Sequence, residues 1–416
     1  MTGVRFEPKV ERIRNDIMKF AEFVSPGEPP YTRISFSPED REARAYVRLL
    51  MEGAHLQVRT DAAGNIVGRR KGAEGLAPIV IGSHLDTVRG GGRFDGVAGV
   101  VAALEVARRT EELRVELAHP LEVVVFLAEE PSPFGISTIG SRAMAGKLTG
   151  EHLAITDKTG RSLGEALREV GGDPDRLPEA IRSTGGICAF LELHIEQGPH
   201  LESAGVPLGV VTGIVGIWRG HIEVKGQPDH AGTTPMGRRR DALAAGSDIV
   251  LALERVCAAA GDMVGTVGRV EVFPNALNVI PGRMVLGMEM RGLTIDRIEA
   301  AARQFTDRLD RIRDERGVDI SFDFSMTSSP VHFPEEVLAV VRGTAQRLQI
   351  PYVELQSGAG HDANHLAGIA PGAMIFVPSK DGRSHCSDEW TDFDDIRIGC
   401  EVLAAALVEL DRRQKA

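Results

Sequence analysis

The sequence predicts an α/β protein with a mixed central sheet flanked by helices and an inserted, smaller α+β domain. Two observations lead to this fold class. Short apolar runs alternate with segments of helical apolar spacing, the pattern of a sheet that helices cover on both faces. Between about residue 216 and residue 327 the order becomes β-α-β-β-α-β, which is typical of a four-stranded antiparallel sheet with two helices on one face.

The elements of the sheet domain are predicted from apolar periodicity and turn residues. Residues 77–81 are an uninterrupted apolar run that ends in Gly-Ser, which is typical of a buried strand of a parallel sheet. Before residue 216 we also expect helices over residues 8–24, 38–54 and 97–109, a hairpin of residues 56–60 and 65–70, and strands over residues 121–128 and 189–195. Beyond residue 330 we expect helices over residues 335–348 and 393–412 and strands over residues 352–356 and 373–377.

An inserted domain would explain why the order of elements changes after residue 216. A chain of 416 residues also exceeds what one hydrophobic core usually serves. We therefore expect two domains, one made of residues 1–215 and 328–416 and the other of residues 216–327. The inserted elements are strands over residues 217–225, 264–273, 283–291 and 318–326 and helices over residues 240–260 and 295–316.

The composition argues against several kinds of partner. Hydrophobic residues make up 43% of the chain and charged residues 26%, as in globular proteins. A net charge of −11 argues against binding to nucleic acid or to an anionic membrane. No apolar run approaches the ~20 residues of a membrane span, and residues 1–6 lack the apolar core of a signal peptide. Four scattered cysteines indicate reduced thiols, so we expect a cytoplasmic protein.

A candidate metal site begins where the apolar run of residues 77–81 ends. His84 follows this strand, and ligand sites in open α/β sheets gather at the carboxyl ends of strands. Asp86 is two residues further on, where it can accept the other ring N–H of His84. A Gly-rich turn can then bring Asp95 back toward His84. A loop histidine and a turn aspartate are common on their own, so the metal hypothesis depends on the other strand ends.

Three further strand ends have residues of the metal-ligand type. Glu129 and Glu130 end one apolar strand, His194 lies near the end of the next, and His385 follows the last. Histidines with shared carboxylates suit zinc, manganese or cobalt. A carboxylate that bridges two ions ~3.5–4 Å apart lets both act on one oxygen. Adjacent glutamates are usually a solvated strand end, but here one can bind metal while the other moves a proton.

The order of the motifs resembles a known family along nearly the whole chain. The motifs are GSHLDT (82–87), FDG (94–96), EE (129–130), HIEQGP (194–199), HAGTTPM (230–236), NVIPG (278–282), GAGHDA (358–363) and His385. They resemble the M20 metallopeptidase superfamily. Within it they resemble the hydantoinase/carbamoylase branch, which acts on N-carbamoyl amino acids, β-ureidopropionate and allantoate.

The resemblance implies a role for each ligand-type residue. Asp95 would bridge two divalent metal ions (zinc, manganese or cobalt). His84 and His194 would complete the protein ligands of one ion, and Glu130 and His385 would complete those of the other. Glu129 would be the general base. Peptidases of the family tend to have an acidic residue where this chain has His194, which favours the ureido branch.

The resemblance also places most of the substrate contacts in the inserted domain, as a lid and dimerisation domain. His230 would stabilise the oxyanion, and Arg291 would hold the substrate carboxylate through two parallel hydrogen bonds. Asn278 and Gln197 would be polar contacts to the substrate. His361 resembles a further contact, although a loop histidine that caps nearby backbone is about as common.

We expect a homodimer, because related dimers complete the active site with a lid histidine from the neighbouring chain. An antiparallel sheet with an unpaired edge strand suits such pairing. The alternative is a lid that closes over its own subunit, with His230 acting in cis.

The leading hypothesis is a two-metal hydrolase that cleaves the carbamoyl group from an N-carbamoyl-L-amino acid. The alternatives are hydrolysis of allantoate or β-ureidopropionate, less favoured hydrolysis of dipeptides, and a non-catalytic binding protein. The chain departs from many relatives at two places. Residues 131–142 are longer than the usual stretch after Glu130, and Glu289 stands near Arg291 where an aspartate is frequent.

Overall fold

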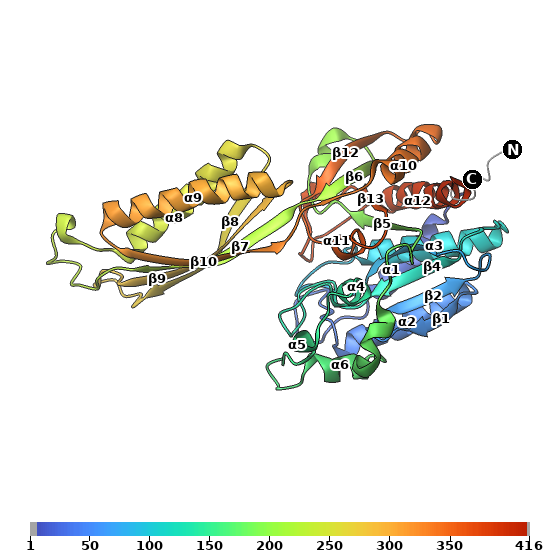
Figure 1. Cartoon of the computed structure of the whole chain (residues 1–416), viewed down its shortest axis with the longest axis horizontal. Coiled ribbons are helices and arrows are strands. Elements are labelled where there is room, and N and C mark those ends of the chain that lie inside the picture. The colour runs from blue at the N-terminus through green and yellow to red at the C-terminus, as the bar shows by residue number, and fades with distance from the viewer. Residues whose placement is uncertain (1–5, 414–416) are drawn as a thin grey trace. The chain divides into compact units, whose positions relative to one another are not determined.

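The structure, a computed structural model, describes residues 6–413 (Figure 1). Residues 1–5, on which most of the signal-peptide prediction depends, lie outside the described residues, as do residues 414–416. The chain divides into two compact units. The large unit contains the described residues up to Thr212, Phe333–Ser357 and those from His361 onward, and the small unit contains Gly213–His332 and Gly358–Gly360.

The large unit is built on a mixed sheet, as the sequence predicts. Its strand order is β1-β2-β4-β3-β5-β13-β6, and β12 also pairs with β6. The short strand β11 (Val331–His332) pairs with the last residues of β6. The strands are β1 (Gln57–Thr60), β2 (Ile66–Arg70), β3 (Ile79–His84), β4 (Leu121–Phe126), β5 (Ala189–Ile195), β6 (Leu208–Ile214), β12 (Tyr352–Ser357) and β13 (Gly372–Val377).

Four adjacent strands, β4, β3, β5 and β13, run parallel to one another in the middle of this sheet. Every residue of these four strands is buried. A sheet buried on both faces selects continuous apolar runs rather than alternation, which is why the sequence reveals them. Because the strands are parallel, their carboxyl ends meet at one edge of the sheet.

Helices cover this sheet, and α3 is buried along nearly its whole length against β3, β5 and α12 (Figure 1). Several short helices between residues 139 and 204, and strand β6, are absent from the sequence prediction. A helix of one or two turns contains too few residues to show an apolar period. The helices are α1 (Val10–Phe20), α2 (Pro38–Gly53), α3 (Val97–Glu112), α4 (Ile139–Met144), α5 (Gly150–Leu153), α6 (Leu163–Glu169), η1 (Pro174–Ala180), α7 (His200–Ala204), α10 (Glu335–Arg347), α11 (Ala363–Leu366), η3 (Lys380–Gly382) and α12 (Phe393–Arg413).

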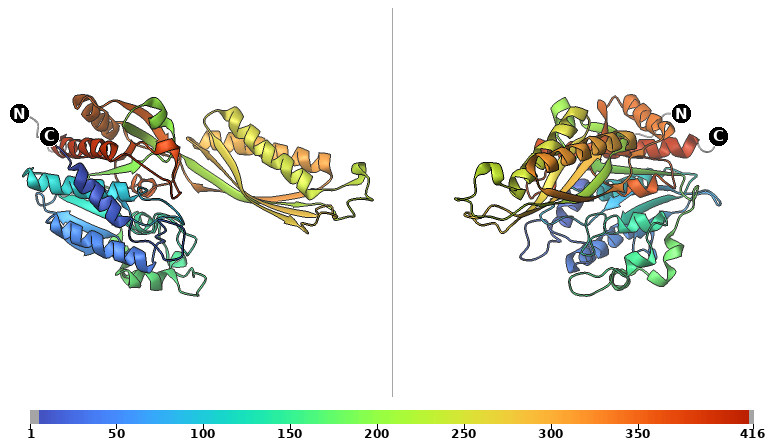
Figure 2. Two further views of the ribbon diagram at one scale, coloured as in Figure 1. Left: turned by 180° about the vertical axis from the view of Figure 1, so that it is seen from behind. Right: turned by 60° about the vertical axis from the view of Figure 1, so that its left-hand side comes forward.

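The small unit has the predicted order β-α-β-β-α-β and an antiparallel sheet with strand order β10-β7-β9-β8. Figure 2 shows both long helices on one face of this sheet. Alternate residues of β9, from Met284 to Met290, pack into a core with these helices. The elements are β7 (Gly216–Lys225), η2 (Met236–Arg238), α8 (Ala242–Ala260), β8 (Val264–Phe273), β9 (Arg283–Gly292), α9 (Ile295–Arg316) and β10 (Asp319–Ser328).

In residues 6–413, no helix combines the length and the apolar character that crossing a membrane requires.

Candidate metal centre

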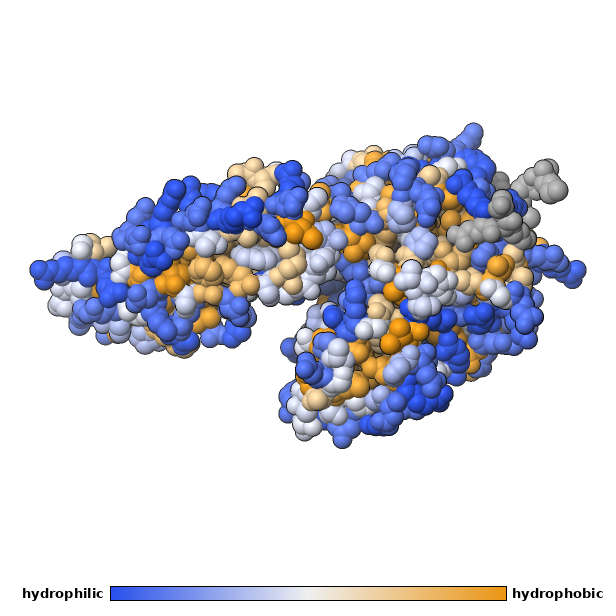
Figure 3. Space-filling model, viewed as in Figure 1, coloured by the Kyte–Doolittle hydropathy of each residue, from blue (hydrophilic) through white to orange (hydrophobic). Residues whose placement is uncertain are grey.

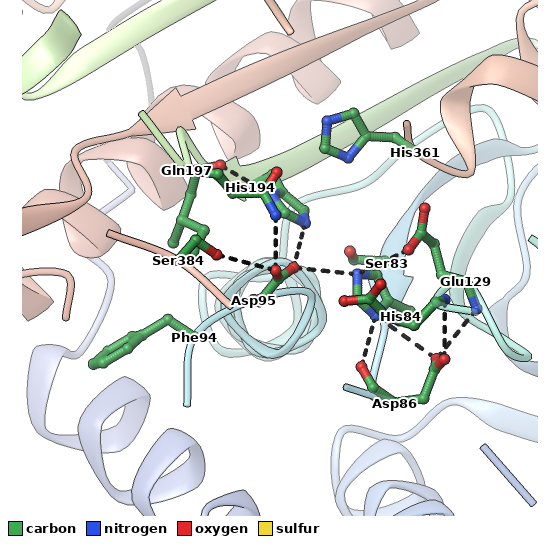
Figure 4. A network of polar contacts seen from close by, with 12 residues as sticks. Ser83, His84, Asp86, Phe94, Asp95, Glu129, His194, Gln197, His361 and Ser384 are labelled. Carbon is green, nitrogen blue, oxygen red and sulfur yellow. Dashed lines mark hydrogen bonds and ion pairs between the residues drawn. The ribbon is translucent and has the colours of Figure 1, made fainter. Parts of the chain in front are cut away.

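The four parallel strands bring the ligand-type residues of the large unit together. His84 is the last residue of β3, and His194 is the last but one of β5. Glu129 and Glu130 follow β4, and His385 follows β13. The carboxyl ends of these strands meet at one edge, so residues as far apart in sequence as His84 and His385 surround one point. That point is the side chain of Asp95 (Figure 4).

Asp95 lies two residues before α3, and Gly96 allows His84 to approach it. Gly96 has φ of +65°, and a Cβ at this position would lie 2.4 Å from the His84 ring. No side chain larger than hydrogen fits there without moving the imidazole. The Gly-rich turn therefore does what the sequence predicts and brings Asp95 to His84.

Asp95 is in contact with three histidines. One of its carboxylate oxygens faces His84 and His194, and the other faces His385. Its Oδ1 lies 3.5 Å from Nε2 of His84 and 3.2 Å from Nε2 of His194. Its Oδ2 lies 3.1 Å from Nε2 of His385, and that nitrogen is 3.3 Å from Oε1 of Glu130. The two oxygens thus belong to two different groups of three side chains.

Burial and mutual contact shift the pKa values of these groups. Burial alone would raise the pKa of Asp95, but its contacts with the histidines outweigh burial and hold the pKa well below its ordinary value. Burial raises the pKa of Glu129 well above its ordinary value, and the charge of Glu130 adds to the shift. Contacts with Asp95 and Glu130 raise the pKa of His385 to about 10. Bound cations would change this balance, because they would be the largest charges in the cluster.

The hydrogen bonds of the histidines show that the cluster fits divalent cations. Nδ1 of His84 lies 3.0 Å from the carbonyl oxygen of Asp86, and Nδ1 of His194 lies 2.9 Å from that of Ile195. A carbonyl oxygen only accepts, so Nδ1 has the proton in each neutral ring and Nε2 has a free lone pair. Both Nε2 atoms face Asp95, an acceptor, and a cation between them would satisfy both. Nε2 of His194 has no hydrogen-bond partner within residues 6–413.

Two groups of donors share Asp95. His84, Asp95 and His194 each offer one ligand atom within 4.8 Å of the others, and so do Asp95, Glu130 and His385. Mixed nitrogen and oxygen donors suit zinc, manganese or cobalt, whereas calcium takes six to eight oxygens. The residues present could therefore hold one divalent ion on each side of Asp95.

Asp86 supports the cluster through its carboxylate, but not through the bond that the sequence predicts. The ring N–H of His84 is directed to the backbone carbonyl of Asp86, and the carboxylate oxygen Oδ1 is further away, at 3.7 Å. The carboxylate instead accepts the backbone N–H groups of Glu129, at 3.2 Å, and Glu130, at 3.0 Å. It also accepts the hydroxyl of Ser35, at 2.8 Å. Asp86 thus orients the glutamate pair.

Strained backbone accompanies three of the loops at this edge. Ala128, Gln197 and His385 have φ of +51°, +60° and +54°, a region that residues other than glycine seldom adopt. Each precedes or is a residue of the predicted site. Such strain persists only where the surrounding structure imposes it, and it is concentrated at functional sites in proteins.

Gln197 and His361, two predicted substrate contacts, both adjoin this cluster. Nε2 of Gln197 donates to Oδ2 of Asp95 at 2.7 Å. The ring of His361 is buried and packs edge-on against that of His194, with centroids 4.7 Å apart. Its Nε2 lies 2.6 Å from Oγ of Ser357. Burial lowers the pKa of His361 well below its ordinary value, and the neighbouring ring of His194 adds to the shift.

The small unit brings two further predicted residues together. His230 and Asn278 are 48 positions apart in sequence, yet residue 230 forms a β-bridge with Val279. The backbone N–H of Ala231 also donates to the carbonyl of Asn278 at 3.0 Å. Both His230 and Asn278 are exposed. The structure therefore places them next to each other on the surface of this unit.

Arg291, also in the small unit, already has anionic and carbonyl partners. Its Nη2 lies 2.7 Å from Oε1 of Glu289, and its Nη1 donates to the carbonyl of Gly358 at 2.6 Å. The second oxygen of Glu289 accepts from Nε of Arg219 at 2.8 Å. Glu289 thus connects two arginines on the helix-free face of the sheet.

Comparison with known proteins identifies the family to which this chain belongs. Residues 80–409 match peptidase family M20/M25/M40. The chain belongs to this M20 family. It is 42% identical to the N-carbamoyl-L-amino acid amidohydrolase of Geobacillus stearothermophilus. The aligned region of 394 residues covers 94% of this chain and 96% of the relative. It is 36% identical over 389 residues to the allantoate amidohydrolase of Escherichia coli, covering 91% and 92%.

A solved structure confirms the fold. The hydantoinase/carbamoylase family amidase of Burkholderia multivorans has a TM-score of 0.88 and 35% sequence identity. The match covers 97% of this chain and 98% of that chain. The predicted fold class and the resemblance to the hydantoinase/carbamoylase branch are therefore confirmed.

The stretch after Glu130, residues 131–142, packs largely into the protein. Phe134 is 5% exposed and its ring contacts that of Phe36 edge-on, with centroids 5.5 Å apart. Further on, Oγ of Ser141 donates to the buried carboxylate of Asp362 at 2.5 Å. This stretch thus forms part of a core cluster and connects it to the loop of His361.

Sequence reasoning missed two residues that contact the candidate metal centre of this M20 protein. Ser384 and Glu389 flank His385, and Glu389 accepts hydrogen bonds from the backbone N–H groups of Phe94 and Asp95. The only signal in the sequence is an acidic residue four positions after His385. Partners nearly 300 positions away leave no local pattern.

Proposed function

We propose that this protein hydrolyses the carbamoyl C–N bond of N-carbamoyl-L-amino acids, releasing ammonia, carbon dioxide and the amino acid. The observation that supports this most is the convergence of three histidines and Glu130 on Asp95, with Glu129 beside them. The relatives named N-carbamoyl-L-amino acid amidohydrolase support the substrate. A relative named allantoate amidohydrolase supports allantoate as the second candidate.

Two divalent ions (zinc, manganese or cobalt) are the proposed cofactors. His84, Asp95 and His194 would hold one, and Asp95, Glu130 and His385 would hold the other. Such a pair supplies polarisation of the carbamoyl oxygen and a lower pKa of the attacking water.

Glu129 is the proposed general base. Its Oε2 lies 3.8 Å from Nε2 of His84, so it is beside the proposed ligands without belonging to either group of three. The backbone bonds to Asp86 fix its direction. Glu129 would take a proton from the attacking water and give it to the leaving nitrogen, as one carboxylate can in the two halves of a hydrolysis.

The other predicted residues would bind substrate. Arg291 would receive the substrate carboxylate, for which its planar guanidinium offers two parallel donors. Glu289 would have to release it, and can do so while keeping its bond to Arg219. His230 would stabilise the oxyanion, and Asn278, Gln197 and His361 would contact the polar groups of the substrate.

A panel of substrates tests the proposed function. N-carbamoyl-L-amino acids should be hydrolysed at least tenfold faster, by kcat/KM, than allantoate, N-carbamoyl-β-alanine, N-carbamoyl-D-amino acids or dipeptides. Ammonia and primary amine are measured together, because carbamoyl hydrolysis releases both and dipeptide hydrolysis releases only new amine. If allantoate is preferred, the second candidate is right, and turnover of none of these compounds would favour a binding protein.

We also propose a homodimer in which His230 acts across the interface. Strand β8 is an edge of its sheet, and Val264, Val270 and Phe273 on it are exposed. Apolar side chains are visible on the surface of the small unit in Figure 3. An edge strand with apolar side chains is a template for a two-fold partner. A cytoplasmic location stays a prediction.

A mixing experiment distinguishes action in trans from action in cis. Two inactive variants, His230→Ala and Glu129→Gln, are mixed in equal amounts and allowed to exchange subunits. In trans, each mixed dimer has one site with an intact Glu129 from one chain and an intact His230 from the other. Half of the dimers are mixed and half of their sites are intact, so activity should return to about a quarter of wild type. A mixture that stays inactive after confirmed exchange would show that His230 acts in cis.

A further inference from the structure

Glu389 is a buried carboxylate that joins two distant loops of the metal centre. Its side chain is fully buried, and Oε1 accepts the backbone N–H of Phe94 at 2.8 Å and of Asp95 at 3.2 Å. Glu389 belongs to the loop that contains His385, four positions earlier. It therefore connects this loop to the backbone of the residue on which both groups of ligands converge.

Ser384 makes a second connection between the same loops. Its hydroxyl lies 2.8 Å from Oε2 of Glu389 and 3.3 Å from Oδ2 of Asp95 (Figure 4). One hydroxyl hydrogen thus lies between two carboxylates. Oδ2 is the oxygen of Asp95 that also contacts His385, whereas Oδ1 faces His84 and His194. This connection is therefore on one side of Asp95 only.

The chain leaves space for Glu389 at Gly92. This glycine has φ of +103°, and a Cβ there would lie 2.3 Å from Oε1 of Glu389. Any other residue at position 92 would displace the carboxylate from the N–H groups that it accepts. The loop before Asp95 and the loop after β13 are thus fitted to each other through one side chain.

We propose that Glu389, with Ser384, is a positioning residue that fixes Asp95 relative to His385 and so sets the affinity for the divalent ion on the Glu130 side. The inference rests on the proposed two-ion function. Glu389 does not reach the ion; it acts through the backbone of Asp95 and through the loop of His385. Partners that orient the ligands of a metal typically change its affinity about ten- to hundredfold when they are altered.

Titration calorimetry of the metal-free protein with Co²⁺ tests the proposal. Glu389→Gln keeps the shape but has an NH₂ group in place of one acceptor, so it should weaken one of the two binding steps about ten- to hundredfold. The weakened step should be the one that Glu130→Gln also weakens. Ser384→Ala, which leaves the backbone bonds intact, should weaken the same step by less. The other step should stay within about twofold of wild type in both variants.

Asp411→Asn is the matched control. Asp411 is also a buried carboxylate that accepts a backbone N–H from a distant segment, that of His119 at 2.7 Å, away from the metal centre. It should lower the melting temperature of the metal-free protein without changing either binding step.

Three outcomes would overturn the inference. If Glu389→Gln and Ser384→Ala bind both ions as wild type does, Glu389 does not position the ligands. If Glu389→Gln weakens both steps equally, its role is general stability. If wild type binds no Co²⁺, the proposed function fails as well.

Discussion

Removal of divalent ions with a chelator should reduce hydrolysis of N-carbamoyl-L-amino acids to background. The large unit gathers three histidines and three carboxylates at one point, and no lysine or arginine contacts any of the six among the residues that the structure describes. Divalent cations would supply the positive charge that stabilises the negative charge developing on the carbamoyl oxygen. Activity is measured as ammonia release before chelation, after chelation, and after Zn²⁺, Mn²⁺ or Co²⁺ is returned.

The control for this experiment is chelator that has been saturated with metal, which should leave activity unchanged. Elemental analysis of the active protein should find up to two transition-metal ions per chain. Turnover that persists in chelator, in protein without transition metal, would exclude the proposed cofactors.

The Glu129→Gln variant should lose roughly 10²–10⁴-fold in kcat while it keeps its metal ions. Glutamine fills the same space but cannot take a proton from the attacking water. Glu129 is 8% exposed and is outside both groups of three donors, so its loss should leave the ions in place. Rates are measured with saturating substrate, and metal content is measured on the same sample.

Glu130→Gln is the matched control for Glu129, because it changes the adjacent residue in the same way. Oε1 of Glu130 lies 3.3 Å from Nε2 of His385, within one of the groups of donors. This variant should bind one ion more weakly and recover part of its rate at high metal concentration. If both variants lose metal equally and slow equally, the proposed division of roles between the two glutamates is wrong.

Much of the fold could be predicted because buried strands and long helices have strong patterns. The parallel strands are buried on both faces, so each is an apolar run, and β9 alternates because only one of its faces packs on helices. The gathering of His84, His194 and the glutamates follows from the rule that parallel strands end at one edge. The family motifs added the role of each residue, and those roles stay predictions.

Other features have no local pattern. Strand β13 pairs with β6, which is about 160 positions earlier, and nothing in either sequence identifies the other. The carboxylate of Asp86 was predicted to accept the ring N–H of His84. In the structure the backbone carbonyl of Asp86 accepts that N–H, and the carboxylate accepts the backbone N–H groups of Glu129 and Glu130. Contacts of side chains with distant backbone, such as those of Glu389, depend on the finished fold.

The place of β13 in the sheet has a consequence for biosynthesis. This strand lies between β5 and β6, so a segment that leaves the ribosome among the last fills the middle of the sheet. Until residue 377 has been synthesised, β5 and β6 each have an edge without its partner, and such edges are prone to pair wrongly. The small unit has its own core and can fold earlier in translation. The proposed cation site that needs His385 can form only after that residue has been synthesised, so the ion held there would stabilise the finished protein and not its nascent intermediates.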